Sequence, residues 1–141
     1  MLNPFKVYAV DNGLRNAVSF AFSRDTGRLF ETAAALELKI RDSDMYYWKN
    51  SQGAEVDFVL MKGRKVSQLI QVCYDITESE VKKREISALV NASRELKCSN
   101  LLTITQDYEA SEKVIWRGSR RTIKFIPLWK WLLELKNNGR I

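Results

Sequence analysis

Acidic and amide side chains that could do chemistry together occur at three places in the chain. Glu31 lies in an alanine-rich stretch, where burying a carboxylate is costly unless it is paired or bound to a metal. Glu55 and Asp57 are two residues apart in a strand-like sequence, so both are expected on one face. Gln71 and Cys73 have the same spacing on the next expected strand. Oxygen ligands of this kind suit a hard cation such as Mg²⁺.

The composition argues against several other chemistries. The chain has no histidine and two cysteines, Cys73 and Cys98, without a Cys-x-x-Cys pair. A zinc site and a histidine-based triad are therefore disfavoured, and catalysis would have to use carboxylates, lysines or a hard cation. No GxxxxGK[ST] motif is present, so no ATP site of the P-loop type is expected in this chain.

The sequence predicts a cytoplasmic protein without a membrane partner. No apolar run approaches the roughly 20 residues needed to span a bilayer, and the amino terminus lacks the long apolar stretch of a secretory signal. The scattered cysteines suggest a reducing compartment. The oligomeric state is not indicated.

A net charge of +6 is compatible with a polyanion such as DNA, although a soluble basic protein with no such partner would have the same balance. Two clusters are candidates for phosphate contacts. The first cluster, at residues 82–84, is expected at the start of a helix, where a run of charges is usually a solvated face. The second cluster, at residues 117–121, lies near a turn. The candidates are Lys82, Lys83, Arg84, Arg117, Arg120 and Arg121.

The elements that must position these residues fit one domain covering residues 1–141. Residues 1–22 are expected as a lead-in, with an extended stretch at Phe5–Val10 and a short helix at Leu14–Phe22. Apolar periodicity and turn residues then predict a helix and a three-strand antiparallel meander. These lie at Leu29–Ile40, Met45–Lys49, Glu55–Met61 and Val66–Tyr74.

A long helix at Thr77–Cys98 should follow, with Thr77 and Glu80 spaced as a capping box. Because this helix separates two strands, it predicts a crossover and a parallel pairing with Leu101–Thr105. The remaining pattern predicts a mixed α/β sheet with helices on both sides. Its last elements are expected at Val114–Trp116, Thr122–Ile126 and a helix that starts at Pro127.

A helix glutamate, a strand aspartate and a two-spaced pair on the next strand resemble the PD-(D/E)xK nuclease superfamily. Glu31 matches its helix acid and Asp57 its strand aspartate, while Gln71 and Cys73 occupy the places of the acid and lysine of ExK. The resemblance implies a restriction-endonuclease-like fold and Mg²⁺ or Mn²⁺ held by Glu31 and Asp57, with Glu55 and Gln71 as further ligand candidates.

A narrower resemblance covers nearly the whole chain. The segments KVYAVDNGL, GRLFE, YYWKNSQGAEVDFVL, LIQVCYD, KKREISAL and IPLWKWLL are similar to the carboxy-terminal domain of a family of prokaryotic AAA+-type ATPases. This resemblance implies an ATPase module as partner. Arg84-Glu85 resembles a recurrent Arg-Glu in that domain, so one of the two is expected to face the site.

The chain departs from the nuclease pattern at two positions, and this decides the functional expectation. Gln71 is neutral, and Cys73 supplies no cation to activate water; Lys39, Lys82 and Lys83 are the candidates to replace it. We expect an accessory domain with weak or lost nuclease activity that binds DNA or docks a protein. The alternative is an active metal-dependent DNA endonuclease. Purely structural roles are the alternative for all five residues, including a Glu31–Arg28 pair, a solvated strand face for Glu55 and Asp57, and core packing for Cys73.

Overall fold

The computed structural model describes residues 2–4 and 26–137. They form a seven-stranded mixed sheet in the order β1-β2-β3-β4-β5-β7-β6. The strands are β1 (Leu2–Pro4), β2 (Asp44–Lys49), β3 (Glu55–Lys62), β4 (Lys65–Val72), β5 (Leu101–Thr105), β6 (Ala110–Trp116) and β7 (Ser119–Pro127). The described helices are α2 (Thr26–Ile40), α3 (Ser79–Leu96) and α4 (Leu128–Asn137).

The predicted meander is confirmed, since β2, β3 and β4 pair antiparallel in sequence order. Its two turns are formed by residues suited to turn conformations. Asn50 Oδ1 accepts hydrogen bonds from the backbone N–H groups of Gln52 and Ala54, which closes the first turn. Gly63 has a positive φ of 67° in the second, a conformation that favours glycine.

The predicted crossover is also confirmed. After α3 the chain returns as β5, which lies parallel to β4 and to β7. All five residues of β5 are buried, as expected for a strand covered on both faces. The strands β6 and β7 form an antiparallel hairpin at the sheet edge.

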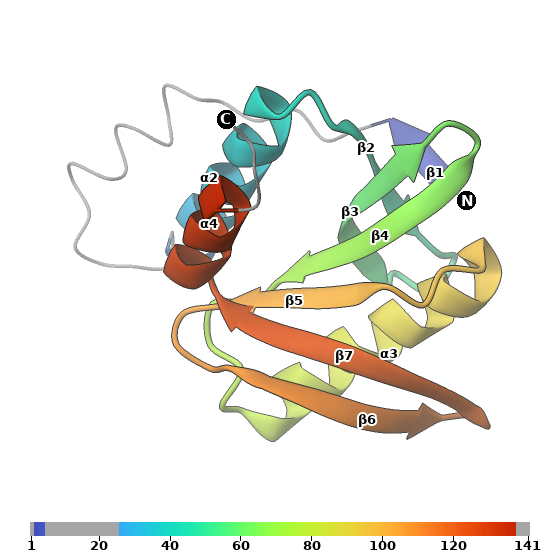
Figure 1. Cartoon of the computed structure of the whole chain (residues 1–141). Coiled ribbons are helices and arrows are strands. Elements are labelled where there is room, and N and C mark those ends of the chain that lie inside the picture. The colour runs from blue at the N-terminus through green and yellow to red at the C-terminus, as the bar shows by residue number, and fades with distance from the viewer. Residues whose placement is uncertain (1, 5–25, 138–141) are drawn as a thin grey trace.

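Helices cover both faces of the sheet, as predicted, and Figure 1 shows α2 and α4 on one side and α3 on the other. The core is therefore divided into two clusters. The cluster beneath α3 includes Trp48, Val56, Val59, Leu69, Cys73, Leu89 and Phe125. The cluster beneath α2 and α4 includes Ala34, Leu38, Phe58, Ile70, Ile104 and Trp131. Within the described residues, no helix has the length and apolar composition needed to cross a membrane.

The predicted capping box at the start of α3 is wrong. Asp75 Oδ1 accepts hydrogen bonds from both the backbone N–H and the hydroxyl of Thr77, which holds Thr77 in the preceding loop. The helix begins after Glu78, whose side chain makes no capping hydrogen bond. The elements predicted at Phe5–Val10 and Leu14–Phe22 lie outside the described residues. Within the predicted lead-in, Leu2–Pro4 forms a strand on β2, which the sequence did not indicate.

Candidate functional site

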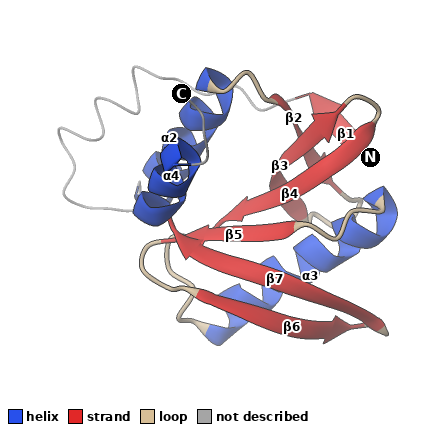
Figure 2. Ribbon diagram, viewed as in Figure 1, coloured by secondary structure: helices blue, strands red, loops and turns tan. Residues whose placement is uncertain are grey.

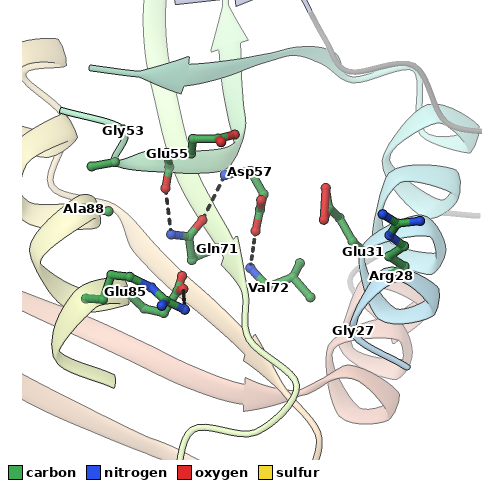
Figure 3. A pocket seen from close by; sticks show the side chains of 12 residues that line it. Gly27, Arg28, Glu31, Gly53, Glu55, Asp57, Gln71, Val72, Glu85 and Ala88 are labelled. Atoms are coloured by element: carbon green, nitrogen blue, oxygen red, sulfur yellow. Dashed lines mark hydrogen bonds and ion pairs between the residues drawn. The ribbon is translucent and has the colours of Figure 1, made fainter. Parts of the chain in front are cut away.

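The site lies where β3 and β4 separate. Their backbone pairing ends at Phe58 and Ile70, and side chains then take over the hydrogen bonds between the strands. Gln71 Oε1 accepts from Asp57 N at 2.9 Å, and Gln71 Nε2 donates to the carbonyl oxygen of Glu55 at 2.9 Å. Asp57 Oδ2 accepts from Val72 N at 2.9 Å (Figure 3). These three bonds clamp the two strands at the opening.

A β-bulge turns Asp57 into the site. Tyr46 pairs with Val59 and Trp48 with Val56, so Asp57 and Phe58 together lie opposite the single residue between them on β2. Regular strand alternation would place Val56 and Phe58 on one face of the sheet, and the bulge separates them. Val56 packs beneath α3, whereas Phe58 packs beneath α2 and α4, because the extra residue changes the alternation of β3.

A pocket of about 500 Å³ occupies the opening between the strands. Residues from both sides of the sheet meet there, and the predicted site residues Glu31, Glu55, Asp57 and Gln71 all line it. Figure 3 shows the Glu31 side chain on α2 pointing toward Asp57. The described residues that line it are Gly27, Arg28, Glu31, Gly53, Ala54, Glu55, Asp57, Gln71, Val72, Arg84, Glu85 and Ala88.

The acidic residues that line this pocket are not arranged as a metal centre in the structure. In the described part of the chain, no three acidic, cysteine or histidine side chains are grouped so that they could hold a metal ion. One oxygen of Asp57 faces the Val72 N–H, and the amide oxygen of Gln71 faces the Asp57 N–H. Binding of Mg²⁺ or Mn²⁺ by Glu31, Asp57, Glu55 or Gln71 stays a prediction.

Cys73, which the resemblance puts at the lysine position of the site, is not among the residues that line the pocket. It is buried beneath α3, and its thiol donates to the carbonyl oxygen of Asp75 at 3.4 Å. Burial, followed by the nearby carboxylate of Glu85, raises the pKa of this thiol to about 12. Near neutral pH Cys73 is therefore an uncharged core residue. The replacement candidates Lys39, Lys82 and Lys83 do not line the pocket either.

Glu85 is the pocket acid that was not among the predicted ligands. The expectation that Arg84 or Glu85 faces the site is met by both. Burial and the nearby Asp57 carboxylate raise the pKa of Glu85, while Arg84 and a hydrogen bond with Gln71 lower it, with a net rise. Its spacing to the buried Ala88 and Ala92, at i+3 and i+7, was the signal that could have marked it.

Replacing Glu85 with glutamine is expected to stabilise the protein at neutral pH. Because folding raises the pKa of Glu85, the folded state holds its proton more tightly than the unfolded state does. Ionised Glu85 therefore lowers the free energy of unfolding at higher pH, and this loss disappears below its unfolded pKa. Urea unfolding from about pH 7 to about pH 4 should show a weaker pH dependence in Glu85→Gln. An equal change in the matched variant of exposed Glu80 would contradict this assignment.

The three predicted basic residues of α3 do not form one surface. Lys82 Nζ lies 2.8 Å from Glu112 Oε2 and over the ring of Tyr108. Lys83 is exposed, and Arg84 lines the pocket beside Glu85. Their charges are therefore directed to different parts of the molecule.

The predicted arginines of the β6–β7 hairpin lie apart from the pocket. Arg120 and Arg121 line a separate surface hollow of about 540 Å³, which shares no residue with the first pocket. The Arg121 Nε donates to Ser93 Oγ at 2.6 Å, so this side chain is turned onto α3. Arg117 lies over the ring of Trp116 at the turn. The proposed DNA contacts thus do not converge beside Asp57.

Two comparisons place the chain among known proteins. Residues 26–131 match the family model described as Domain of unknown function (DUF4143), a domain found carboxy-terminal to AAA ATPase-like proteins. The chain is also similar to the uncharacterized protein MJ1544 of Methanocaldococcus jannaschii, with 37% identity over 134 residues. That similarity covers 91% of this chain and 29% of MJ1544, so the chain spans less than a third of the relative's length.

Proposed function

The chain belongs to the DUF4143 family, and from this membership and its pocket we propose that it is the accessory domain of a AAA+-type ATPase. In this proposal the domain has a restriction-endonuclease-like scaffold that has lost its nuclease activity. It acts by docking a protein segment.

The observation that carries the proposal is the bonding of Gln71. Both ends of its amide are engaged by the β3 backbone, the oxygen by Asp57 N and the nitrogen by Glu55 O. A glutamate at this place, as in ExK, could not donate to Glu55 O when ionised. The residue at the expected metal-ligand position therefore holds two strands together, and the buried Cys73 supplies no cation.

Protein docking is favoured over DNA binding by how the basic groups are distributed. Lys82 is paired with Glu112, Arg84 contacts Glu85, and Arg121 is bonded to Ser93. DNA binding without sequence preference usually depends on several cations directed at one phosphate backbone. The described residues beside the pocket do not form such an array.

An active metal-dependent DNA endonuclease is the second candidate. It is supported by the carboxylates of Glu31, Glu55, Asp57 and Glu85, which line one pocket together with Arg84. A divalent cation entering this pocket would meet four acidic groups, and a phosphate could meet Arg84. The two candidates differ in a single measurable property, which is cleavage.

We expect the purified domain to cut no DNA with Mg²⁺ or Mn²⁺. A missing proton-transfer group alone lowers rates by about 10²–10⁴-fold. The assay compares single-stranded, duplex and branched DNA, with wild type and Asp57→Asn side by side. The asparagine removes the charge but retains an oxygen that can accept from Val72 N. Cleavage that is lost in Asp57→Asn and retained in the control Asp44→Ala would establish the endonuclease and refute the proposal.

A further inference from the structure

The strand β6 is an edge strand of the sheet that the described residues form. It is seven residues long, and among the described strands only β7 pairs with it. Figure 2 shows β6 as the outermost strand, beyond β7. An edge strand of this length presents a row of backbone N–H and C=O groups to which another extended chain can add.

The two faces of the β6–β7 hairpin differ in what covers them. On one face, Glu112 bonds to Lys82 of α3 and Val114 packs against the cluster beneath α3. Strand alternation places Lys113 and Ile115 on the opposite face. Their cross-strand partners there are Thr122 and Arg120, respectively.

We call this opposite face the ribbon face, defined by Lys113, Ile115, Arg120 and Thr122. All four are exposed, with Ile115 exposed to 68%, and all four line the 540 Å³ hollow. Among the described residues, the lining of that hollow includes the basic residues Lys113, Arg120 and Arg121 and no acidic one, and Ser99 and Val114 also contribute to it. Ile115 lies between the cations Lys113 and Arg120, next to the backbone edge of β6. A ligand of this surface therefore needs negative charge, an apolar group and an extended backbone.

We propose that the ribbon face and the β6 edge bind an acidic extended peptide segment, which adds to the sheet as a further strand. The inference rests on the proposed docking function and names the kind of segment that is docked. Carboxylates of the segment would lie beside Lys113 and Arg120, and an apolar side chain would cover Ile115. The backbone of the segment would pair with β6.

The observations favour a peptide over a nucleic acid as the occupant. Only part of the basic charge near the hairpin is directed outward, because Arg121 bonds to Ser93 and Arg117 lies over Trp116. A phosphate backbone would leave Ile115 and the strand edge without matching partners. A strand that carries acidic and apolar side chains in turn along one face, at every second residue, matches the cations, the isoleucine and the backbone edge together.

The test measures binding of a fluorescent peptide to the whole 141-residue chain by anisotropy at low salt. The probe is the seven-residue peptide Glu-Thr-Val-Thr-Glu-Thr-Val, which places glutamate and valine in turn on one face of an extended strand. The double variant Lys113→Glu with Arg120→Glu should bind this peptide at least about tenfold more weakly, because like charges then oppose each other. The same variant should gain binding of the matching lysine and valine peptide. The control Lys62→Glu with Lys65→Glu makes the same charge change at the exposed β3–β4 turn, and should change neither binding.

A backbone readout separates strand addition from simple charge attraction. A peptide with a central proline should fail to bind, and the glutamate and valine peptide should slow amide hydrogen exchange in residues 110–116. Equal binding by the proline peptide, or an equal loss in the control variant, would overturn the proposal. Binding of DNA but not of the peptide would overturn it too, and would assign the ribbon face to nucleic acid. None of these results alters the cleavage assay, so failure of this inference is distinguishable from failure of the proposed function.

Discussion

Replacing Gln71 with glutamate is expected to lower the free energy of unfolding by about 2–4 kcal/mol at neutral pH. The carbonyl oxygen of Glu55 would lose its donor, and a third carboxylate would enter the space beside Asp57 and Glu85. Leaving one buried polar group unsatisfied typically costs about 1–3 kcal/mol, and the added charge increases this. Urea unfolding followed by circular dichroism measures the loss.

The pH dependence of this variant gives a second, independent check. A carboxyl at position 71 would have its pKa raised by burial and by its acidic neighbours, so the folded state would bind the proton more tightly. The loss of stability should therefore shrink as the pH falls, since a protonated carboxyl can again donate to Glu55 O. Gln68→Glu makes the same change at a solvent-exposed hydrogen bond on the same strand. Equal losses in both variants would show that the clamp has no special role.

Replacing Trp48 with alanine is expected to cost about 3–5 kcal/mol of stability, the largest effect of any single tryptophan for which the structure describes the surroundings. Trp48 is 1% exposed in the cluster beneath α3, and its Nε1 donates to Glu95 Oε2 at 3.1 Å. Its removal would leave a large cavity between β2 and α3.

Trp129 provides the matched control for this prediction. It lies on α4 with 60% of its surface exposed, so Trp129→Ala should change the free energy of unfolding by about 0.5 kcal/mol or less. Guanidinium unfolding of both variants at one temperature makes the comparison. A larger loss at Trp129 than at Trp48 would contradict the burial described for both.

The elements that the sequence predicted are those whose signals are local. The turn at Asn50 and the glycine at position 63 mark the ends of strands, and alternation between them defines the meander. The length of the helix before Leu101 was enough to predict a parallel crossover. Glu55 and Asp57, which the sequence grouped by their spacing, both line one pocket, although the bulge interrupts the alternation of β3.

The bulge, the Gln71 hydrogen bonds and the extent of the pocket were not predicted, because each depends on contacts between residues that are far apart in the sequence. Nothing in the run from Val56 to Leu60 signals a bulge, because the apolar residues in it suit either face of the sheet. The clamp by Gln71 exists only because β3 and β4 separate at that point. Cys73 shares a face with Gln71, as expected, yet the pocket ends before it is reached.

The basic clusters show why adjacency in sequence is a poor guide to a binding surface. Successive helix residues point about 100° apart, so Lys82, Lys83 and Arg84 leave α3 in three directions. On the hairpin, neighbours alternate between faces, which separates Arg120 from Arg121. Only the placement of acidic partners such as Glu112 decides which cations remain available to a ligand.

Because β5 pairs parallel to β4 after a long crossover, the two strands become available for pairing at different times during synthesis. The meander is synthesised before α3 and β5, so its last strand, β4, lacks its second neighbour in the sheet until both have left the ribosome. An apolar strand with an open side is a point of aggregation. The long crossover that gives the sheet its mixed topology therefore also sets an interval in which the nascent chain needs protection, and that interval lasts for the synthesis of α3.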